Sequence, residues 1–403
     1  MNRFRLLRGS PRLICCYHED VNTFDVAIIG GGAIGDAIAF ELAAEKLRVV
    51  VLDRQQPGRE ASWAAAGMLS PGPDSPEALP MTPLARESFQ LYPEFVSAIE
   101  DVSGKSTAFL RQGTLEIFPG PHGELEREKM AAEYRRLGLA IEAISFEAAR
   151  KIEESLGPAA RVAAWLADEA VLDPRLLMEA VLGAARGRGV EIRSDCPVTS
   201  VLVERNHCSG VVAGGEKIAA KYVVVAAGCF SAGIDWLARY APTRPVRGQM
   251  LALRAGGLRL RGVVRSEKGY LVPRRDGRII AGSTLENAGF EKHVTPGGVR
   301  QILEGVLELV PGLAGAEILE TWAGLRPGTP DNLPILGPTD IEGLLVATGH
   351  HRNGILLTPV TARLLREWIV RGETSFNAEA FSPLRFAEEE LRPGSPRGAS
   401  AHS

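Results

Sequence analysis

A glycine-rich turn near the N-terminus has the residue types and spacing that point most directly to chemistry. Residues 30–35, GGGAIG, match the pattern G-x-G-x-x-G, and Asp53 follows the next apolar segment. Gly30 permits the tight turn, Gly32 lets the backbone approach a pyrophosphate, and Gly35 lets a helix pack on a strand. A helix N-terminus at this point offers N–H groups and a positive dipole end to phosphates. Because Asp53 can accept hydrogen bonds from ribose hydroxyls, the unit predicts a bound dinucleotide.

The elements that must position these residues follow from the pattern of apolar side chains. Residues 26–29 are an apolar run of the length typical of a buried parallel strand, and a helical pattern follows the glycines directly. Residues 48–52 predict a second strand that ends at Asp53. Strand, helix, second strand and terminal acid thus occur in the order that a dinucleotide-binding βαβ unit requires.

Farther along the chain, two kinds of region alternate. Strands that end in small residues recur at 217–225 and 344–349, and the second precedes a helix predicted over 355–369. Between them, residues 244–283 contain short strands split by Gly and Asp turns. The pattern predicts an α/β protein in which a Rossmann-like dinucleotide-binding domain is interleaved with a second domain on a mixed, largely antiparallel sheet.

Composition and charge exclude several classes of protein. The 403 residues are 45% hydrophobic and 24% charged, with a formal net charge of −3. This ordinary globular composition has no electrostatic footprint for nucleic acid or an anionic membrane surface. No run approaches the roughly 20 apolar residues that span a bilayer, so no membrane span is expected. The five cysteines lack metal-ligand spacing and indicate reduced thiols in a cytoplasmic protein without a metal site.

The separation of the glycine-ended strands favours FAD over NAD. A typical NAD domain completes its nucleotide-binding sheet in two successive halves, whereas here inserted segments separate the strands that precede Gly228 and Gly349. FAD is long and needs distant loops along its length. A helix N-terminus around residues 354–357 would also place N–H groups near the pyrimidine edge of a flavin and stabilise negative charge on the reduced ring.

Five segments carry a family resemblance. They are GREASWAAAGML at 58–69, PVRGQML at 245–251, GYLVPR at 269–274, TWAGLRPGTPDNLPILG at 321–337 and ATGHHRNGILLTP at 347–359. With these segments the chain resembles the D-amino-acid oxidase superfamily of FAD enzymes over about residues 25–370, and most closely its glycine oxidase branch, which is linked to thiamine biosynthesis. The element after Arg326 is shared across the superfamily, whereas 58–69 and 349–356 are more specific for the glycine oxidase branch.

The resemblance implies oxidative deamination of glycine or a similar small amino acid. A hydride passes from Cα to flavin N5, water hydrolyses the resulting imine, and O2 is reduced to H2O2, in a reaction that supplies thiamine thiazole synthesis. The expected FAD-binding domain comprises residues 24–100, 155–240 and 320–372, and the expected substrate-binding domain comprises 101–154 and 241–319. Residues 1–23 are expected to be a disordered extension and 373–403 a C-terminal tail.

The resemblance also implies which residues contact the cofactor. Asp53 and Arg54 would meet the adenosine end, Met68 would lie near the isoalloxazine, and no cysteine stands where relatives attach flavin covalently, so FAD is expected to bind non-covalently. Family members more often have Glu at the position of Asp53. The residues expected to contact FAD are Gly30, Gly32, Ala33, Ile34, Gly35, Asp53, Arg54, Ala61, Ser62, Ala66, Gly67, Met68, Val198, Gly228, His350, His351, Arg352, Asn353, Gly354, Ile355 and Leu356.

Three residues are expected to form the catalytic site: Arg326, Tyr270 and Arg352. A guanidinium grips a carboxylate through two parallel hydrogen bonds, so Arg326 would bind the substrate carboxylate while Tyr270 adds its hydroxyl and Arg352 borders the site. Residue types alone leave two alternatives open. Arg326 could instead pair with Asp331, and Tyr270 could be a core ring with a solvated tip.

Four other positions bear on the choice of substrate and on whether the protein binds a metal ion. The pair His350 and His351 has no matching ligands nearby, so it is interpreted as positioning backbone beside the flavin. Leu285 stands where the characterised type has methionine, and Lys268 occupies a position near the pocket that varies. Both departures leave the choice among glycine, sarcosine and small D-amino acids open.

Two alternative functions are compatible with the sequence. One is a D-amino-acid dehydrogenase that passes electrons to another acceptor, such as a quinone. The other is a flavoprotein subunit that binds FAD without catalysis, which the presence of both Arg326 and Tyr270 disfavours. The expected partners are a small amino acid and O2. A homo-oligomer is compatible with the sequence, which does not fix the oligomeric state.

Overall fold

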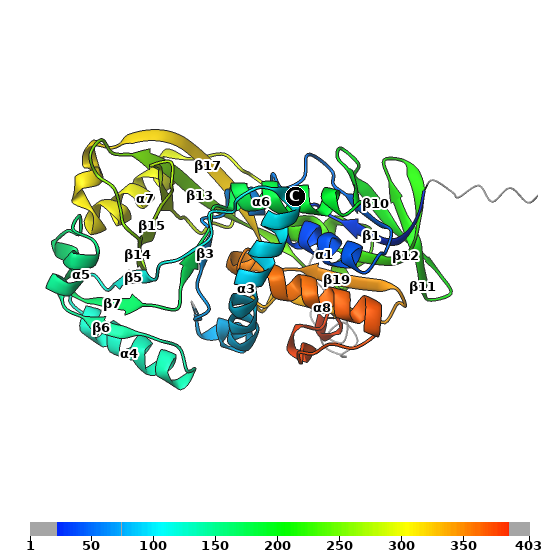
Figure 1. Cartoon of the computed structure of the whole chain (residues 1–403), viewed down its shortest axis with the longest axis horizontal. Coiled ribbons are helices and arrows are strands. Elements are labelled where there is room, and N and C mark those ends of the chain that lie inside the picture. Colours follow the sequence, from blue (N-terminus) through cyan, green and yellow to red (C-terminus); the bar gives the residue numbers. More distant parts are fainter. Residues whose placement is uncertain (1–21, 74, 387–403) are drawn as a thin grey trace, which may run out of the picture.

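The computed structural model describes residues 22–73 and 75–386. Figure 1 shows an elongated molecule with one sheet at each end and helices α3, α6 and α8 beside the middle. The predicted extension at 1–23 lies outside the described residues except for its last two positions, and the predicted tail lies outside them beyond residue 386. Within the described residues, no helix is long and apolar enough to cross a membrane.

The N-terminal βαβ unit is confirmed. Strand β1 (Thr23–Ile29) leads into α1 (Ala33–Ala44), and β2 (Val49–Leu52) returns parallel to β1, with Val26 opposite Val49. The turn between β1 and α1 requires glycine twice. Gly30 has φ +106°, and a Cβ at Gly35 would overlap the Gly30 carbonyl oxygen. The glycines thus bring the start of α1 against the end of β1.

The first large sheet extends this unit on both sides, in the order β10-β11-β12-β1-β2-β9, with β18 and β19 beside β12. Its centre is parallel, because β12 and β2 flank β1 in parallel and β19 runs parallel to β12. The hairpins β10–β11 and β18–β19 add antiparallel edges. The added strands are β9 (Glu191–Arg193), β10 (Val198–Glu204), β11 (His207–Ala213), β12 (Glu216–Val225), β18 (Ile335–Pro338) and β19 (Leu344–Thr348).

Four long helices cover one face of this sheet. Helix α1 packs against α6 (Pro174–Gly187) and α8 (Thr358–Arg371), and both of these pack against α3 (Thr82–Ser103). The predicted start of α6 is confirmed, since the Asp173 side chain accepts a hydrogen bond from the Arg175 N–H (2.9 Å) and Pro174 occupies the first turn. The opposite face carries a smaller core around Leu237 and Tyr240.

The second large sheet has the order β17-β13-β16-β15-β14-β5-β7-β6. Every neighbouring pair is antiparallel except β14 with β5, so the predicted mixed, largely antiparallel sheet is confirmed. Helix α7 (Pro296–Leu309) packs on β13, β15 and β16. The strands are β5 (Thr114–Ile117), β6 (Glu142–Ile144), β7 (Ala163–Leu166), β13 (Arg244–Arg254), β14 (Val263–Ser266), β15 (Gly269–Pro273), β16 (Ile279–Gly282) and β17 (Glu317–Gly328).

Short elements connect the two sheets. A small antiparallel sheet of β3 (Met68–Leu69), β8 (Ala170–Val171) and β4 (Leu110–Arg111) lies between them, and α2 (Ala61–Ala64) packs on α6 and β17. Helix α4 (Gly123–Arg136) and the shorter α5 (Phe146–Ile152) accompany the edge strands β5 to β7 (Figure 1).

Three expectations about boundaries differ from the structure. The expected FAD-binding domain includes residues 320–328 and β7. In the structure, β17 pairs with β13 from Glu317 to Gly328 and β7 pairs with β5, so both strands belong to the second sheet. Helix α8 begins at Thr358, later than the predicted 355, because a 3₁₀ turn at His351–Asn353 and a further turn precede it. The described part of the predicted tail packs on the fold, where Phe381 is buried and Arg385 pairs with Asp331 (2.8 Å). We therefore propose domain boundaries that follow the sheets.

Candidate active site

A cavity of about 1340 Å³ is lined by residues of both large sheets and of the segments between them. At one end it meets the turn after β1, Asp53 at the end of β2, and Val198 of β10. At the other end it meets Met68, Tyr270 and Arg326. Ligand pockets are commonly about 300–1,000 Å³, so this cavity has room for a large cofactor together with a small substrate.

The glycine turn exposes the start of α1 to this cavity. Gly32 is the cap residue of α1 and has no side chain to cap the helix. A Cβ at Gly32 would meet only the Ser62 hydroxyl (3.2 Å), and that hydroxyl accepts a hydrogen bond from the Ala33 N–H (3.0 Å). The uncapped first turn of α1 and its dipole are therefore directed at the cavity, as an anion site requires.

Asp53 is held by the backbone on both sides. Its two carboxylate oxygens accept hydrogen bonds from the Gly31 N–H (2.8 Å) and the Gln55 N–H (2.9 Å). Each oxygen keeps a second lone pair that can accept from a ribose hydroxyl. The shorter side chain, where relatives more often have Glu, is thus fixed at the cavity wall.

Arg326 lies on β17 and faces the cavity, and glycine on the adjacent strand makes room for it. A Cβ at Gly248 would overlap its guanidinium. The guanidinium donates to the Ser283 hydroxyl (2.7 Å) and to the Thr284 carbonyl (3.1 Å). Burial lowers the pKa of Arg326, but a guanidinium remains charged in proteins.

The alternative pairing of Arg326 is wrong. Asp331 instead forms an ion pair with Arg385 and accepts a hydrogen bond from the Thr329 hydroxyl (3.2 Å). Among the described residues Arg326 has no carboxylate partner. A buried cation without an acid facing a cavity is arranged to receive an anionic group from a ligand.

Tyr270 lies on β15, and the structure shows why its ring reaches the cavity. Tyr270 stands opposite Gly282 of β16, where a Cβ would lie 2.7 Å from the Tyr270 hydroxyl oxygen. The hydroxyl donates to the Met250 sulfur (3.2 Å), a weak acceptor. The hydroxyl therefore lines the cavity with capacity for a better partner, and it lies close enough to Arg326 to raise the pKa of the guanidinium against the effect of burial.

The segment after β19 brings His350 to Ile355 to the cavity. His350 is buried and its Nε2 lies 3.0 Å from the Thr361 hydroxyl of α8. Burial lowers the pKa of His350 to about 3, so the ring is neutral at physiological pH. A neutral ring hydrogen-bonded to α8 fits the interpretation that His350 positions backbone. Among the described residues no group of three or more His, Cys, Asp or Glu side chains is arranged for a metal ion.

A buried charge cluster forms another part of the wall. Arg265 of β14 donates to Glu116 of β5 (2.5 Å) and to Glu169 (3.1 Å), and the Ser70 hydroxyl also donates to Glu169. Burial raises the pKa of Glu116, and Arg265 opposes that shift. This cluster was not predicted from the sequence, because four separate segments contribute its residues.

All but two of the predicted site residues line the cavity, and the two positions that depart from the family, Leu285 and Lys268, do not line it. Gly35 lies behind the turn, and Leu356 is buried in the core, where its carbonyl accepts from the Ser88 hydroxyl (2.6 Å). Leu285 is 54% exposed, and the Lys268 ammonium pairs with Glu308 (2.8 Å). Neither Leu285 nor Lys268 is among the residues that line the cavity.

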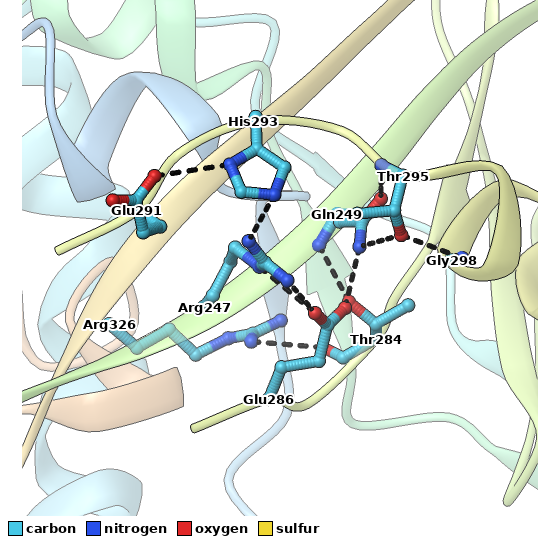
Figure 2. Close-up of polar contacts among 9 residues, drawn as sticks. All are labelled: Arg247, Gln249, Thr284, Glu286, Glu291, His293, Thr295, Gly298 and Arg326. Atoms are coloured by element: carbon cyan, nitrogen blue, oxygen red, sulfur yellow. Dashed lines mark hydrogen bonds and ion pairs between the residues drawn. The ribbon is translucent and has the colours of Figure 1, made fainter. Parts of the chain in front are cut away.

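Ser283 and Thr284, which hold Arg326, are functional residues that sequence reasoning missed. They follow β16 and begin a segment that Arg247 and Gln249 of β13 hold in place (Figure 2). The available signal was the polar pair that follows the predicted strand at 278–281. Its partner could not be identified from one sequence, because Arg326 stands on a strand that was not predicted.

Comparisons with known proteins place this site in a family. The family model described as FAD dependent oxidoreductase matches residues 25–368. The chain belongs to the FAD-dependent oxidoreductase family. It is 36% identical over 375 residues to a bifunctional protein ThiO/ThiG of Trichormus variabilis, covering 91% of this chain but 56% of the relative, so the chain spans about half the length of that protein.

Two further relatives match over nearly their whole length. Glycine oxidase of Pseudomonas putida is 33% identical over 361 residues, with 89% of this chain and 98% of the relative covered. The crystal structure of glycine oxidase from Geobacillus kaustophilus superposes with a TM-score of 0.85 at 30% identity, covering 90% of this chain and 98% of that chain. The resemblance to the D-amino-acid oxidase superfamily is therefore confirmed at the level of the family.

The residues at the cavity fit FAD, the cofactor of the family. The uncapped start of α1 suits the pyrophosphate, and Asp53 suits a ribose. Ala61, Ala66 and Gly67, which have small side chains or none, line the same cavity as Met68. Cys229 also lines the cavity, and burial raises the pKa of its thiol to about 12, so it stays a neutral thiol. FAD binding through non-covalent contacts is consistent with that state.

Proposed function

We propose that this chain is an FAD-dependent amino-acid oxidase that acts on glycine or a similarly small amino acid. The reaction converts glycine, water and O2 into glyoxylate, ammonia and H2O2. The observation that carries the proposal is the buried guanidinium of Arg326, which faces the cavity without a carboxylate partner among the described residues. The relatives named glycine oxidase and ThiO/ThiG support the same substrate and a place in thiamine biosynthesis.

Arg326 and Tyr270 would orient the substrate. The guanidinium donates two hydrogen bonds to the substrate carboxylate, in place of part of its present contacts with Ser283 and Thr284. The Tyr270 hydroxyl, now bonded to the weak acceptor Met250, adds a third contact. Fixing the carboxylate at one end holds Cα in one place, and orientation of this kind is a large part of catalysis in reactions between bound partners.

FAD, when bound, supplies the acceptor for the hydride that leaves Cα. The protein contributes binding, orientation and exclusion of water. His350, neutral and bonded to Thr361, holds the backbone at the end of β19 without adding a charge. The amine substrate must reach the site as a free base, and its own nitrogen lone pair then drives hydride loss without a dedicated protein base.

The experiment that tests the function is steady-state release of H2O2 by purified, FAD-loaded protein with glycine, sarcosine, D-alanine and D-proline. We expect the highest kcat/KM with glycine or sarcosine. Protein that carries FAD but releases no H2O2 with any of the four substrates would refute the oxidase. Reduction of the flavin by these substrates without reoxidation by O2 would instead identify a dehydrogenase.

A further inference from the structure

One segment of the chain connects the substrate anchor to the adenosine side of the cofactor site. Residues 283–295, here called the bridging segment, leave the end of β16 and lead to α7. Ser283 and Thr284 at its start hold the Arg326 guanidinium. Phe290 and Lys292, farther along, contact segments that follow β2 and β12. The bridging segment therefore touches both ends of the site.

Two contacts at the adenosine side, Phe290 with Phe230 and Lys292 with Glu60, are here called the clasp. Phe290 stacks on Phe230, with ring centroids 5.1 Å apart and planes at 24°, and the Arg54 guanidinium carbon lies 3.4 Å from the Phe230 ring centroid. The Lys292 ammonium lies 3.0 Å from the Glu60 carboxylate, which also pairs with Arg54 (2.6 Å). Arg54, Phe230, Phe290 and Glu60 all line the cavity beside Asp53.

Phe290 is a large apolar side chain that is 57% exposed. Its aromatic partner is Phe230, which follows β12 in the part of the fold that holds FAD. Phe290 thus joins the second sheet to the cofactor-binding sheet at the edge of the cavity.

The bridging segment is held to β13 at two points, Glu286 near its start and Thr295 at its end (Figure 2). The backbones of Arg247 and Glu286 exchange two hydrogen bonds of 2.9 Å, and the Arg247 guanidinium pairs with the Glu286 carboxylate. Gln249 donates to Glu286 (2.7 Å) and accepts from the Thr295 N–H (2.8 Å). Both Arg247 and Gln249 are buried, so β13 fixes the segment on either side of Phe290 and Lys292 and limits the positions that these two residues can take.

We propose that the bridging segment couples cofactor retention to substrate binding. Phe290 and Lys292 hold the adenosine side of FAD closed, while Ser283 and Thr284 hold Arg326 for the substrate carboxylate. A bound FAD and a bound carboxylate each favour the same placement of the segment, so each strengthens the binding of the other. The coupling is reciprocal by thermodynamic linkage. The inference rests on the proposed carboxylate-binding role of Arg326.

The test measures the dissociation constant of FAD for apo-protein by flavin fluorescence, with and without saturating acetate as a carboxylate that has no amine to oxidise. In the wild type we expect acetate to tighten FAD binding. Phe290→Ala should weaken FAD binding about three- to tenfold, the loss expected for an aromatic pair, and should diminish the effect of acetate. Phe290→Tyr, which keeps the aromatic ring, should retain the FAD affinity and the acetate effect of the wild type.

Glu291→Gln is the matched control. Glu291 lies between the two clasp residues on the same segment, and its exposed carboxylate pairs with the exposed His293. We expect wild-type FAD affinity and a wild-type acetate effect. An unchanged FAD affinity in Phe290→Ala would overturn the clasp. An acetate effect of equal size in the wild type and in Phe290→Ala would overturn the coupling, because it would show direct contact between the two ligands.

The ion pair of the clasp provides a second, independent variant. Lys292→Met removes the ammonium from Glu60 and leaves the pair between Glu60 and Arg54 in place, and it should weaken FAD binding. An FAD affinity of Lys292→Met equal to that of the wild type would count against the clasp. None of these readouts requires turnover, so an enzyme that binds FAD in this pattern but does not oxidise glycine would refute the proposed function alone.

Discussion

Arg326 shows how one residue can be prepared for a ligand by glycine on the neighbouring strand. Gly248 leaves the space in which the guanidinium lies, and Ser283 and Thr284 fix its direction. Its counterion is absent from the described residues, which supports the proposal that Arg326 receives a substrate carboxylate.

Replacing Arg326 tests this directly. Arg326→Met should lower kcat/KM for glycine roughly 100-fold or more, since truncating one partner of a buried charge pair commonly removes about 2–5 kcal/mol. Arg326→Lys should recover little, because a single ammonium does not reproduce the planar fork. Both variants should keep the flavin absorbance of the wild type. Turnover within threefold of the wild type in either variant would refute the assignment.

Asp36 is a residue whose environment sequence reasoning did not anticipate. It lies in the first turn of α1, completely buried, and neither carboxylate oxygen has a hydrogen-bond partner in the described part of the chain. Burial raises the pKa of Asp36 well above its ordinary value, and the nearby Asp53 charge raises it further. The folded protein therefore holds this carboxyl in its protonated form more readily than the unfolded chain does.

The pH dependence of stability follows from that shift. Above about pH 4 the unfolded chain loses this proton while the folded chain retains it, so the unfolding free energy falls as the pH rises. Asp36→Asn should remove this slope and stabilise the protein by about 1–3 kcal/mol near pH 8, with a smaller effect near pH 5. Urea unfolding near pH 8 and near pH 5 measures the change in unfolding free energy. A gain of the same size at both would contradict the explanation.

At the scale of single residues, the sequence predicts those that belong to local motifs. It does not predict those whose role depends on contacts with distant segments. The turn glycines, Asp53 and Arg326 stand in recognisable local patterns. Ser283, Phe290 and Glu116 acquire their roles only through partners that come from distant strands. A single sequence contains no signal for such pairs.

Individual elements were largely predictable, and the misses have local causes. The glycine turn, the cap at Asp173 and the short apolar strands each have strong local signals. Strand β17 was not predicted because its burial is irregular along its length and because it contains Gly324, Pro327 and Gly328, residue types that are disfavoured inside strands. The predicted start of α8 at 355, directly after Asn353 and Gly354, is too early, because the helix begins at Thr358 with Pro359 in its first turn.

Strand register creates the buried charge cluster at the cavity. Arg265 of β14 stands opposite Tyr270 of β15 on one side and Glu116 of β5 on the other. Arg265→Met would leave Glu116 and Glu169 buried without their cation. We expect a loss of about 3–5 kcal/mol in unfolding free energy, measured by urea denaturation.

A second substitution distinguishes charge from packing in this cluster. Adding Glu116→Gln to Arg265→Met removes one of the two unpaired charges and should restore part of the loss. If the double variant is as unstable as the sum of two independent single losses, the instability arises from lost packing instead.

At the scale of the whole molecule, the C-terminal described segment ties the fold together. Arg385 pairs with Asp331 and donates to the Leu333 and Pro334 carbonyls (3.2 and 3.1 Å). These contacts fix the loop between β17 and β18, which connects the two sheets. The polar composition after Gly372 predicted a tail, since composition does not show that Phe381 and Arg385 have partners elsewhere.

The contribution of this segment can be measured with a matched pair of variants. Arg385→Met should lower the unfolding free energy by about 1–3 kcal/mol, because it removes the cation that pairs with Asp331 and the guanidinium donor to the Pro334 carbonyl. Arg300→Met, which removes an exposed ion pair with Glu304 on α7, should change it by less than about 0.5 kcal/mol. Equal effects of the two substitutions in thermal unfolding would contradict a specific role for Arg385.

The order of strands in the first sheet also bears on how the chain is made. A nascent chain that has emerged as far as β12 already has the glycine turn and Asp53, but β19 and residues 350–355 come more than a hundred residues later. Long-range parallel pairing is slow, and incomplete sheets expose unpaired edges during synthesis. The flavin end of the site is therefore assembled last, and cofactor capture should follow the synthesis of β19 and residues 350–355 rather than that of the first βαβ unit.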